Sequence, residues 1–237
     1  NSRICYSDYG GKTLSGDRTI ANSNFPFDSL PNASYITGAS SNLEYDPTQF
    51  NTMYLGRNNY LLHTQDNGAS FQKVHDFGKM VTSVELSWSD PATIYVCTYE
   101  SWWGAKQVWK TTDNGQNWTD ITPPGTLLNG DDWVPYDITI SNTDANKIWL
   151  ARTSQYGDYP AMDGYQVFQS PDGGVTWTNY SSPSLDGEWP TNIEFQRGTD
   201  GGVYLGTRRG VYYRNNLQST WEPFSNGLPA NCNSTQL

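Results

Sequence analysis

The chain has 237 residues, of which 35% are hydrophobic, and a formal net charge of −10 at pH 7. This length suits one large domain with a sizeable core. No stretch approaches the ~18 consecutive apolar residues of a membrane span, so we expect no membrane insertion. The acidic balance would repel phosphates and argues against a nucleic-acid partner. The composition is typical of a secreted β-protein, and the absence of an initial Met suggests a mature or excised segment.

Three cysteines, Cys5, Cys97 and Cys232, match no spacing of metal ligands. Cys97 lies in an apolar run, so we expect it to be a buried free thiol. Cys5 and Cys232 lie at opposite ends of the chain. They could pair if the ends meet, which the sequence leaves open.

A short motif recurs along the chain with the pattern Ser/Thr-x-Asp-x-Gly-x-x-aromatic, here called the box. Clear copies span residues 64–71, 111–118 and 170–177, and weaker copies span 7–14 and 214–221. Their Asp side chains can accept hydrogen bonds from the N–H groups of the turn, and glycine supplies the positive φ of a tight hairpin. We therefore assign structural roles to eight box residues: Asp66, Gly68, Asp113, Gly115, Trp118, Asp172, Gly174 and Trp177.

Strand-like segments surround each box in a constant order. A first, alternating segment covers residues 42–45, 83–86, 137–140 and 192–195, and a second, continuously apolar segment covers 53–56, 94–97, 148–151 and 203–206. A third segment precedes the box at 60–63, 107–110, 166–169 and 210–213, and a fourth follows at 71–74, 118–121, 177–180 and 221–224. Four short antiparallel strands per ~40–50 residues predict one blade of a β-propeller.

The repeat predicts an all-β propeller segment of about four and a half blades. Complete blades are expected at residues 37–78, 82–125, 134–184 and 190–229, after a half blade at 1–20 and before a tail, 230–237, that leads into a further blade. An open arc would leave strand edges unpaired. Two arrangements remain: a partial propeller, which we favour, or a four-bladed ring closed by the end pieces.

The boxes resemble those of the Asp-box families, also called bacterial neuraminidase repeats. The resemblance implies a propeller but no single activity. These families include sialidases, xyloglucanase-type endoglucanases, sortilin-like receptor domains and photosystem assembly factors. The segments 201–207 and 224–229 look most like secreted or surface propeller modules of Bacteroidota exported by the type IX pathway.

Chain direction assigns the loops to two faces. The box hairpins and the loops from first to second strand share one face. Loops from second to third strand, and those between blades, share the opposite face, here called the loop face. Six aromatic residues are expected there, where they could stack on a sugar or anchor a protein partner, or else fill gaps between blades: Trp102, Trp103, Trp133, Tyr156, Tyr159 and Trp189.

Six carboxylates are also expected on the loop face: Asp131, Asp132, Asp158, Asp163, Asp186 and Glu188. They could supply an acid/base pair for glycoside hydrolysis or bind Ca²⁺, although solvated loop charge is the favoured interpretation. We expect no other cofactor and no metal site. His63 and His75 are interpreted as surface or wall residues.

No catalytic residue is assigned. The sialidase members of the resembled families need an arginine cluster and a Phe/Tyr-Arg-Ile-Pro start, which this sequence lacks, and xyloglucanases need two acids across a cleft between two propellers. The leading hypothesis is a non-catalytic module of a large secreted or cell-surface protein that binds glycan or protein. Its partners would include the rest of a parent chain or copies of itself. The alternatives are a glycoside hydrolase or lyase, and a structural element of a surface appendage.

Overall fold

The computed structural model describes residues 4–5, 17–18, 40–68, 70–100, 105–125, 127, 136–153 and 164–224. These residues form four four-stranded antiparallel sheets and one two-stranded sheet, β1 (Ile4–Cys5) with β2 (Asp17–Arg18). The only helical element among them is a single 3₁₀ turn, η4 (Pro183–Leu185). The all-β class and the four-stranded antiparallel blades expected from the repeat are confirmed.

In each four-stranded sheet the strands lie side by side in chain order. The first sheet contains β3 (Ser40–Tyr45), β4 (Met53–Arg57), β5 (Tyr60–Thr64) and β6 (Gln72–Asp76). The second contains β7 (Met80–Leu86), β8 (Ile94–Tyr99), β9 (Lys106–Thr111) and β10 (Thr119–Asp120). The third contains β11 (Tyr136–Ile140), β12 (Ile148–Arg152), β13 (Val167–Ser170) and β14 (Thr178–Asn179). The fourth contains β15 (Pro190–Phe195), β16 (Val203–Thr207), β17 (Val211–Arg214) and β18 (Glu222–Pro223).

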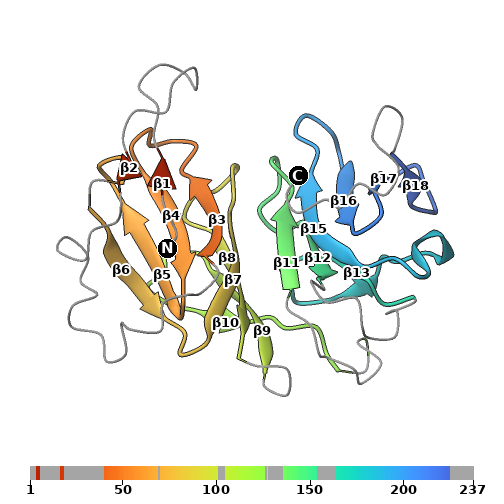
Figure 1. Ribbon diagram of the computed structural model, residues 1–237, viewed down its shortest axis with the longest axis horizontal. Coiled ribbons are helices and arrows are strands. Elements are labelled where there is room, and N and C mark those ends of the chain that lie inside the picture. Colours follow the sequence, from red (N-terminus) through yellow and green to blue (C-terminus); the bar gives the residue numbers. More distant parts are fainter. Residues whose placement is uncertain are drawn as a thin grey trace.

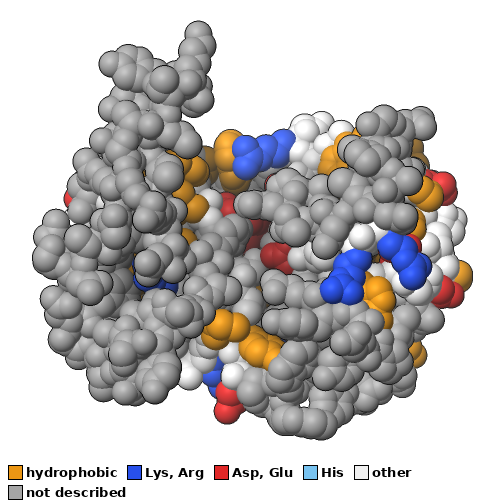
Figure 2. Space-filling view, in the orientation of Figure 1, with side chains coloured by type: hydrophobic (Ala, Val, Ile, Leu, Met, Phe, Trp, Pro, Cys, Tyr) orange, Lys and Arg blue, Asp and Glu red, His pale blue; other side chains and the backbone are white. Residues whose placement is uncertain are grey.

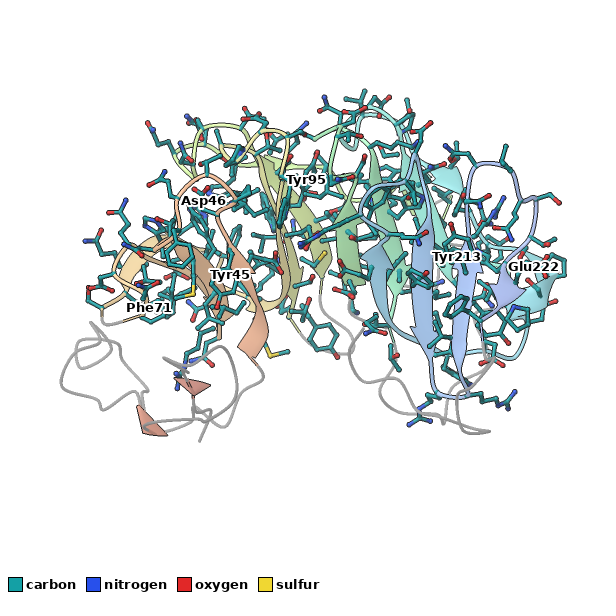
Figure 3. The ribbon with its side chains drawn as sticks, turned by 90° about the horizontal axis from the view of Figure 1, so that it is seen from above. Tyr45, Asp46, Phe71, Tyr95, Tyr213 and Glu222 are labelled. Carbon is teal, nitrogen blue, oxygen red and sulfur yellow. The ribbon has the colours of Figure 1, made fainter. Side chains whose placement is uncertain are left out.

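The four sheets follow one another as an arc, from β3–β6 to β15–β18 (Figure 1). Their inner strands pack in succession, β3 on β7, β7 on β11 and β11 on β15, whereas β15 and β3 do not pack in this way. Figure 3 shows Phe71 of the first sheet and Tyr213 of the fourth at opposite ends of the arc. The described residues therefore form four blades packed face to face, without comparable packing between the first and the last.

The second strands of the second and third blades, β8 and β12, are largely apolar because they are covered on both sides. In β8, Ile94 and Val96 belong to the core shared with the first sheet, whereas Tyr95 and Cys97 belong to the core shared with the third. Cys97 is a buried free thiol, as expected. The second and third blades thus each contribute one face to each of two hydrophobic cores.

Three of the four fourth strands are shorter than the sequence predicted, whereas β6 has five residues. β10, β14 and β18 have two residues each, and each begins one residue after the box tryptophan. The expected strand starts at Trp118, Trp177 and Trp221 are therefore wrong. These aromatic residues leave the strand because their rings pack against the preceding blade.

Of the predicted half blade at residues 1–20, the described part is the two strands β1 and β2. The weaker box at residues 7–14, the tail 230–237 and Cys232 lie outside the described residues, as does the side chain of Cys5. Within the part of the chain that is described, no helix is long and apolar enough to cross a membrane.

Candidate functional site

The three clear boxes have the same hydrogen-bond geometry. In the second, the Thr111 hydroxyl donates to Asp113 Oδ1 at 2.7 Å and accepts from the Gly115 N–H at 3.0 Å. The Asn117 backbone N–H and side-chain amide donate to Asp113 Oδ1 and Oδ2 at 2.9 and 2.7 Å. These bonds lower the pKa of Asp113 to about 2.

Asp66 and Asp172 accept the corresponding bonds in their own turns. The backbone N–H of Ser70 donates to Asp66 and that of Thr176 to Asp172, both at 2.8 Å. Hydrogen bonding also lowers the pKa of Asp172. Both oxygens of each box carboxylate are thus hydrogen-bonded inside the hairpin. This structural role explains why the three Asp residues recur, and no catalytic role is needed.

The box glycines lie where both conformation and space exclude a side chain. Gly115 and Gly174 have φ of +86° and +91°. A Cβ at Gly115 would clash with Val74 of the first sheet, and one at Gly174 would lie 2.6 Å from Ile121 at the end of the second. The second and third boxes are therefore pressed against the preceding blade, where only glycine fits.

The box tryptophans hold neighbouring blades together. The Trp177 indole N–H donates to the Ile121 carbonyl of the second blade at 2.8 Å. In the weaker fourth copy, the Trp221 indole N–H donates to the Tyr180 carbonyl of the third blade at 2.9 Å. Trp118 bonds within its own turn and packs against Phe77 and His75. His63 stacks on Tyr54, so both histidines are packing residues.

Hydrogen bonds agree with the expected assignment of the loops to two faces. The box turns bond to the loop between first and second strands, for example Asn114 N–H to the Ala92 carbonyl at 3.1 Å. At the other end, the Arg208 N–H, between second and third strands, donates to the Trp189 carbonyl, in the connection between blades, at 3.1 Å. The loop face is thus the side of the arc on which the second strands end and the third strands begin.

On the loop face, the carboxylate of Glu188 is buried and hydrogen-bonded. This residue is 7% exposed, accepts a hydrogen bond from the Thr207 hydroxyl at 2.8 Å, and lies 3.8 Å from the Arg209 guanidinium. Trp189, which follows it, is partly exposed. Asp186 is exposed at the end of η4.

Most other expected residues of the loop face lie outside the described residues. They are the aromatic residues Trp102, Trp103, Trp133, Tyr156 and Tyr159, and the carboxylates Asp131, Asp132, Asp158 and Asp163. Where the loop carrying Trp102 and Trp103 begins and ends, Glu100 and Ala105 are joined by a backbone hydrogen bond at 3.1 Å. This pair lies beside Lys79, whose ammonium is 3.9 Å from Glu100.

A second group of acidic residues lies on the inner strands of all four blades: Glu44, Glu85, Asp137 and Glu194, here called the inner acidic group. Acidic side chains are visible near the middle of the molecule in Figure 2. Asp137 accepts bonds from the Ser83 hydroxyl at 2.7 Å and the Ile193 N–H at 2.9 Å. Glu85 accepts from the Ile140 N–H.

Burial raises the pKa values of Glu85, Asp137 and Glu194. For Glu85 the pKa is well above its ordinary value because of burial and the nearby Glu44, Glu194 and Asp137. Burial also raises the pKa of Asp137. The pKa of Glu194 is raised by burial, an effect that the charge of Arg197 opposes. Within the described residues, no three His, Cys, Asp or Glu side chains form a group that could hold a metal ion.

The inner acidic group was not predicted from the sequence, although a signal for it is present. Glu44, Glu85 and Glu194 occupy the same position of the alternating first segment in three blades. A second feature missed is Trp88, which is 41% exposed and stacks beneath the Arg197 guanidinium at 3.8 Å. Trp88 follows the inner strand β7 and Arg197 follows the inner strand β15, so this contact joins the second and fourth blades.

Comparison with known proteins identifies the fold. No family model matches the chain, and no curated protein matches it. Among solved structures, a GH74 enzyme from Niastella koreensis is 22% identical with a TM-score of 0.56, over 76% of this chain and 30% of the enzyme. The fold is that of a β-propeller.

Other propeller structures show the same likeness. A GH74 xyloglucanase from Xanthomonas campestris is 16% identical with a TM-score of 0.57, over 77% of this chain and 30% of that one. YCF48 from Cyanidioschyzon merolae is 14% identical with a TM-score of 0.55, over 78% of this chain and 55% of that one. The chain therefore spans about a third of the GH74 enzymes and about half of YCF48.

Proposed function

We propose that the chain is a non-catalytic propeller module of a larger secreted or cell-surface protein, which binds a glycan or a protein through its loop face. The observation that carries this proposal is the burial of the Glu188 side chain and its contacts with neighbouring residues. Glu188 is the expected acid/base candidate nearest to Trp189, and its carboxylate is buried against Thr207 and Arg209. A carboxylate held in this way supports the loop instead of meeting a substrate.

Trp189 is the described aromatic residue available for binding on the same loop. Its backbone is fixed by the Arg208 N–H, and its side chain is partly exposed. A rigidly held, amphipathic ring loses little conformational entropy when it stacks on a sugar or a partner side chain. Glu188 and Arg208 thus position the ring, and the ring makes the contact.

A binding screen with matched tryptophan variants tests the proposal. Polysaccharides and glycan arrays are screened with the unchanged chain, Trp189→Ala and Trp88→Ala. Trp88 is the control because it is exposed on the box face. We expect Trp189→Ala to weaken binding about tenfold or more, and Trp88→Ala to leave it unchanged. Equal loss in both variants, or in neither, would contradict a binding site around Trp189.

The second candidate function is glycoside hydrolysis, and the inner acidic group is the observation that favours it. A carboxyl whose pKa is raised by burial can serve as a general acid near neutral pH. Glu85 has such a pKa and lies near Asp137 and Glu194. The named activity of the GH74 structures is in line with this candidate, although the chain spans only a third of them.

Isosteric variants separate the two functions. Glu85→Gln and Asp137→Asn remove the acid without removing hydrogen-bonding capacity, and Glu222→Gln on the exposed strand β18 is the control. Hydrolysis predicts product release by the unchanged chain that is lost in the first two variants and kept in the third. The module predicts binding without product release in all four chains.

A further inference from the structure

The outer face of the fourth sheet, which is turned away from the third blade, is defined by Glu194, Tyr204, Val211, Tyr213 and Phe224. We propose that this face is an unfilled blade–blade interface and that its partner is a further four-stranded blade carrying a box tryptophan. The contacts of the second and third interfaces inside the chain repeat residue by residue, and this face carries the same groups. The face is distinct from the loop face, so the proposal is independent of the proposed binding function.

The inner strands supply the first repeated contact. At the second interface, Glu85 accepts a hydrogen bond from the Ile140 N–H of the next inner strand. At the third, the Thr139 hydroxyl accepts from the Phe195 N–H at 3.0 Å. A polar side chain at this position thus satisfies the free backbone edge of the blade that follows.

Glu194 has the same position on the last inner strand. Cross-strand pairing matches Glu85 with Tyr95, Thr139 with Trp149, and Glu194 with Tyr204. Among the described residues, no group donates a hydrogen bond to the Glu194 carboxylate, although the charge of Arg197 lies nearby. Glu194 therefore presents the acceptor that Glu85 and Thr139 use inside the chain.

The box tryptophans supply the second repeated contact. Ile121, Tyr180 and Phe224 are equivalent, because their N–H groups donate to the carbonyls of Val108, Val167 and Val211 at 2.8, 2.8 and 2.7 Å. The carbonyls of Ile121 and Tyr180 then each accept the indole N–H of the following box tryptophan, as described above. Phe224, at the end of the fourth blade, is the third of these equivalent residues.

Solvent exposure distinguishes the outer face of the fourth sheet from the equivalent faces of the second and third sheets. Tyr95 and Trp149, which match Tyr204, are fully buried, and Ile121 is 8% exposed. Tyr204 is partly exposed, and Phe224 is 52% exposed. Tyr204, Tyr213 and Phe224 contact one another with ring centroids 5.0 to 6.4 Å apart, and Figure 3 places Tyr213 at the end of the arc. This aromatic surface corresponds to the faces that the second and third sheets contribute to the cores they share with the blade that follows.

The partner is a further blade and not the first sheet of this chain. The first sheet's own apolar face, formed by Leu55, Tyr60, Leu62 and Phe71, is already buried as a separate cluster. Ring closure onto that sheet, or its docking from a second copy, would require the cluster to be uncovered. A further blade would instead offer free inner-strand N–H groups to Glu194 and a box indole to the Phe224 carbonyl.

The test adds such a blade to the full chain. A second copy of residues 185–224 is fused after Leu237, which supplies the Ile193 and Phe195 N–H groups and the Trp221 indole once more. Amide exchange in β16 and β17 is measured in the full chain with and without the added blade. We expect exchange there to slow about tenfold or more in the extended chain, because the face becomes covered.

Variants of Glu194 make the test specific. In the extended chain, Glu194→Ala in the original copy is expected to reverse most of the added protection, whereas Glu222→Ala is the surface control and should not. Exchange in each extended variant is compared with exchange in the unextended chain that carries the same substitution, so that any effect of Glu194→Ala on the fold itself is subtracted. Exchange in β16 and β17 that is the same with and without the added blade, including because the blade stays unfolded, would overturn the proposal. So would protection that does not depend on Glu194.

Discussion

At the scale of single residues, acidic side chains in this protein divide by what holds them. The box aspartates are partly or fully exposed, yet they are engaged by hydroxyl and N–H donors of their own turns, which lowers the pKa of Asp113 and Asp172. Glu188 is held by a hydroxyl and a guanidinium. An acidic residue in a loop is therefore no guide to catalysis until its donors are known.

The box glycines allow a direct test of blade contact. Gly174 and Gly198 both have positive φ, +91° and +82°, but a Cβ would meet Ile121 only at Gly174. Alanine at Gly198 should lower the free energy of unfolding by about 1–2 kcal/mol through the left-handed conformation alone. Alanine at Gly174 should cost about 1–3 kcal/mol more, because Ile121 must move. Urea denaturation of both variants measures the difference, and equal losses would contradict close packing at Gly174.

Glu188 permits a second test at this scale. Replacement by Ala removes the nearer of two acceptors of the buried Thr207 hydroxyl, the other being the Gly210 carbonyl, and the partner of Arg209. We expect the free energy of unfolding to fall by about 1–3 kcal/mol. Asp186→Ala, two residues earlier and exposed, should change it by less than about 0.5 kcal/mol. Thermal or urea unfolding decides between this role and a free carboxylate, for which both variants would be near neutral.

At the scale of strands and blades, periodicity predicted most of the fold. The continuous apolar run from Ile94 to Cys97 required cover on both faces, and two cores provide it. The ends of the fourth strands could not be predicted, because Trp118 and Trp177 leave the strand for contacts with another blade. The inner acidic group was missed for a related reason: Glu44, Glu85 and Glu194 approach one another only after the inner strands pack.

The indole bonds between blades give a prediction at this scale. Trp177→Phe keeps a ring but leaves the Ile121 carbonyl of the second blade without its donor. We expect a loss of about 1–3 kcal/mol in the free energy of unfolding, with faster amide exchange in β10. Trp118→Phe is the comparison, since its N–H bonds to Gly115 within one turn. Faster exchange in β10 for Trp118→Phe but not for Trp177→Phe would contradict the assignment.

At the scale of the whole molecule, the two kinds of acid predict opposite effects of pH on stability. The pKa values of Glu85, Asp137 and Glu194 are raised, so the folded state takes up protons before the unfolded state does as pH falls. Stability should therefore rise from neutral pH toward about pH 5. The pKa of Asp113 is lowered from 3.8 to about 2, so stability should be lost below about pH 4.

Unfolding midpoints in urea measured from pH 3 to pH 8 test this profile. Glu85→Gln should flatten the rise between pH 8 and pH 5 while leaving the acid limb in place. Glu222→Gln on exposed β18 should leave both limbs unchanged. A profile that rises steadily from pH 5 to pH 8 would show that the inner acidic group is fully ionised at no cost to the fold.

We propose that the chain binds through its loop face and performs no hydrolysis. This proposal is tested by following bound and released carbohydrate together, in one sample over time, for a polysaccharide selected in the screen. We expect saturable binding, weakened by Trp189→Ala, with no new reducing ends. Reducing ends that accumulate in proportion to time and to protein concentration, and that disappear in Glu85→Gln, would contradict it.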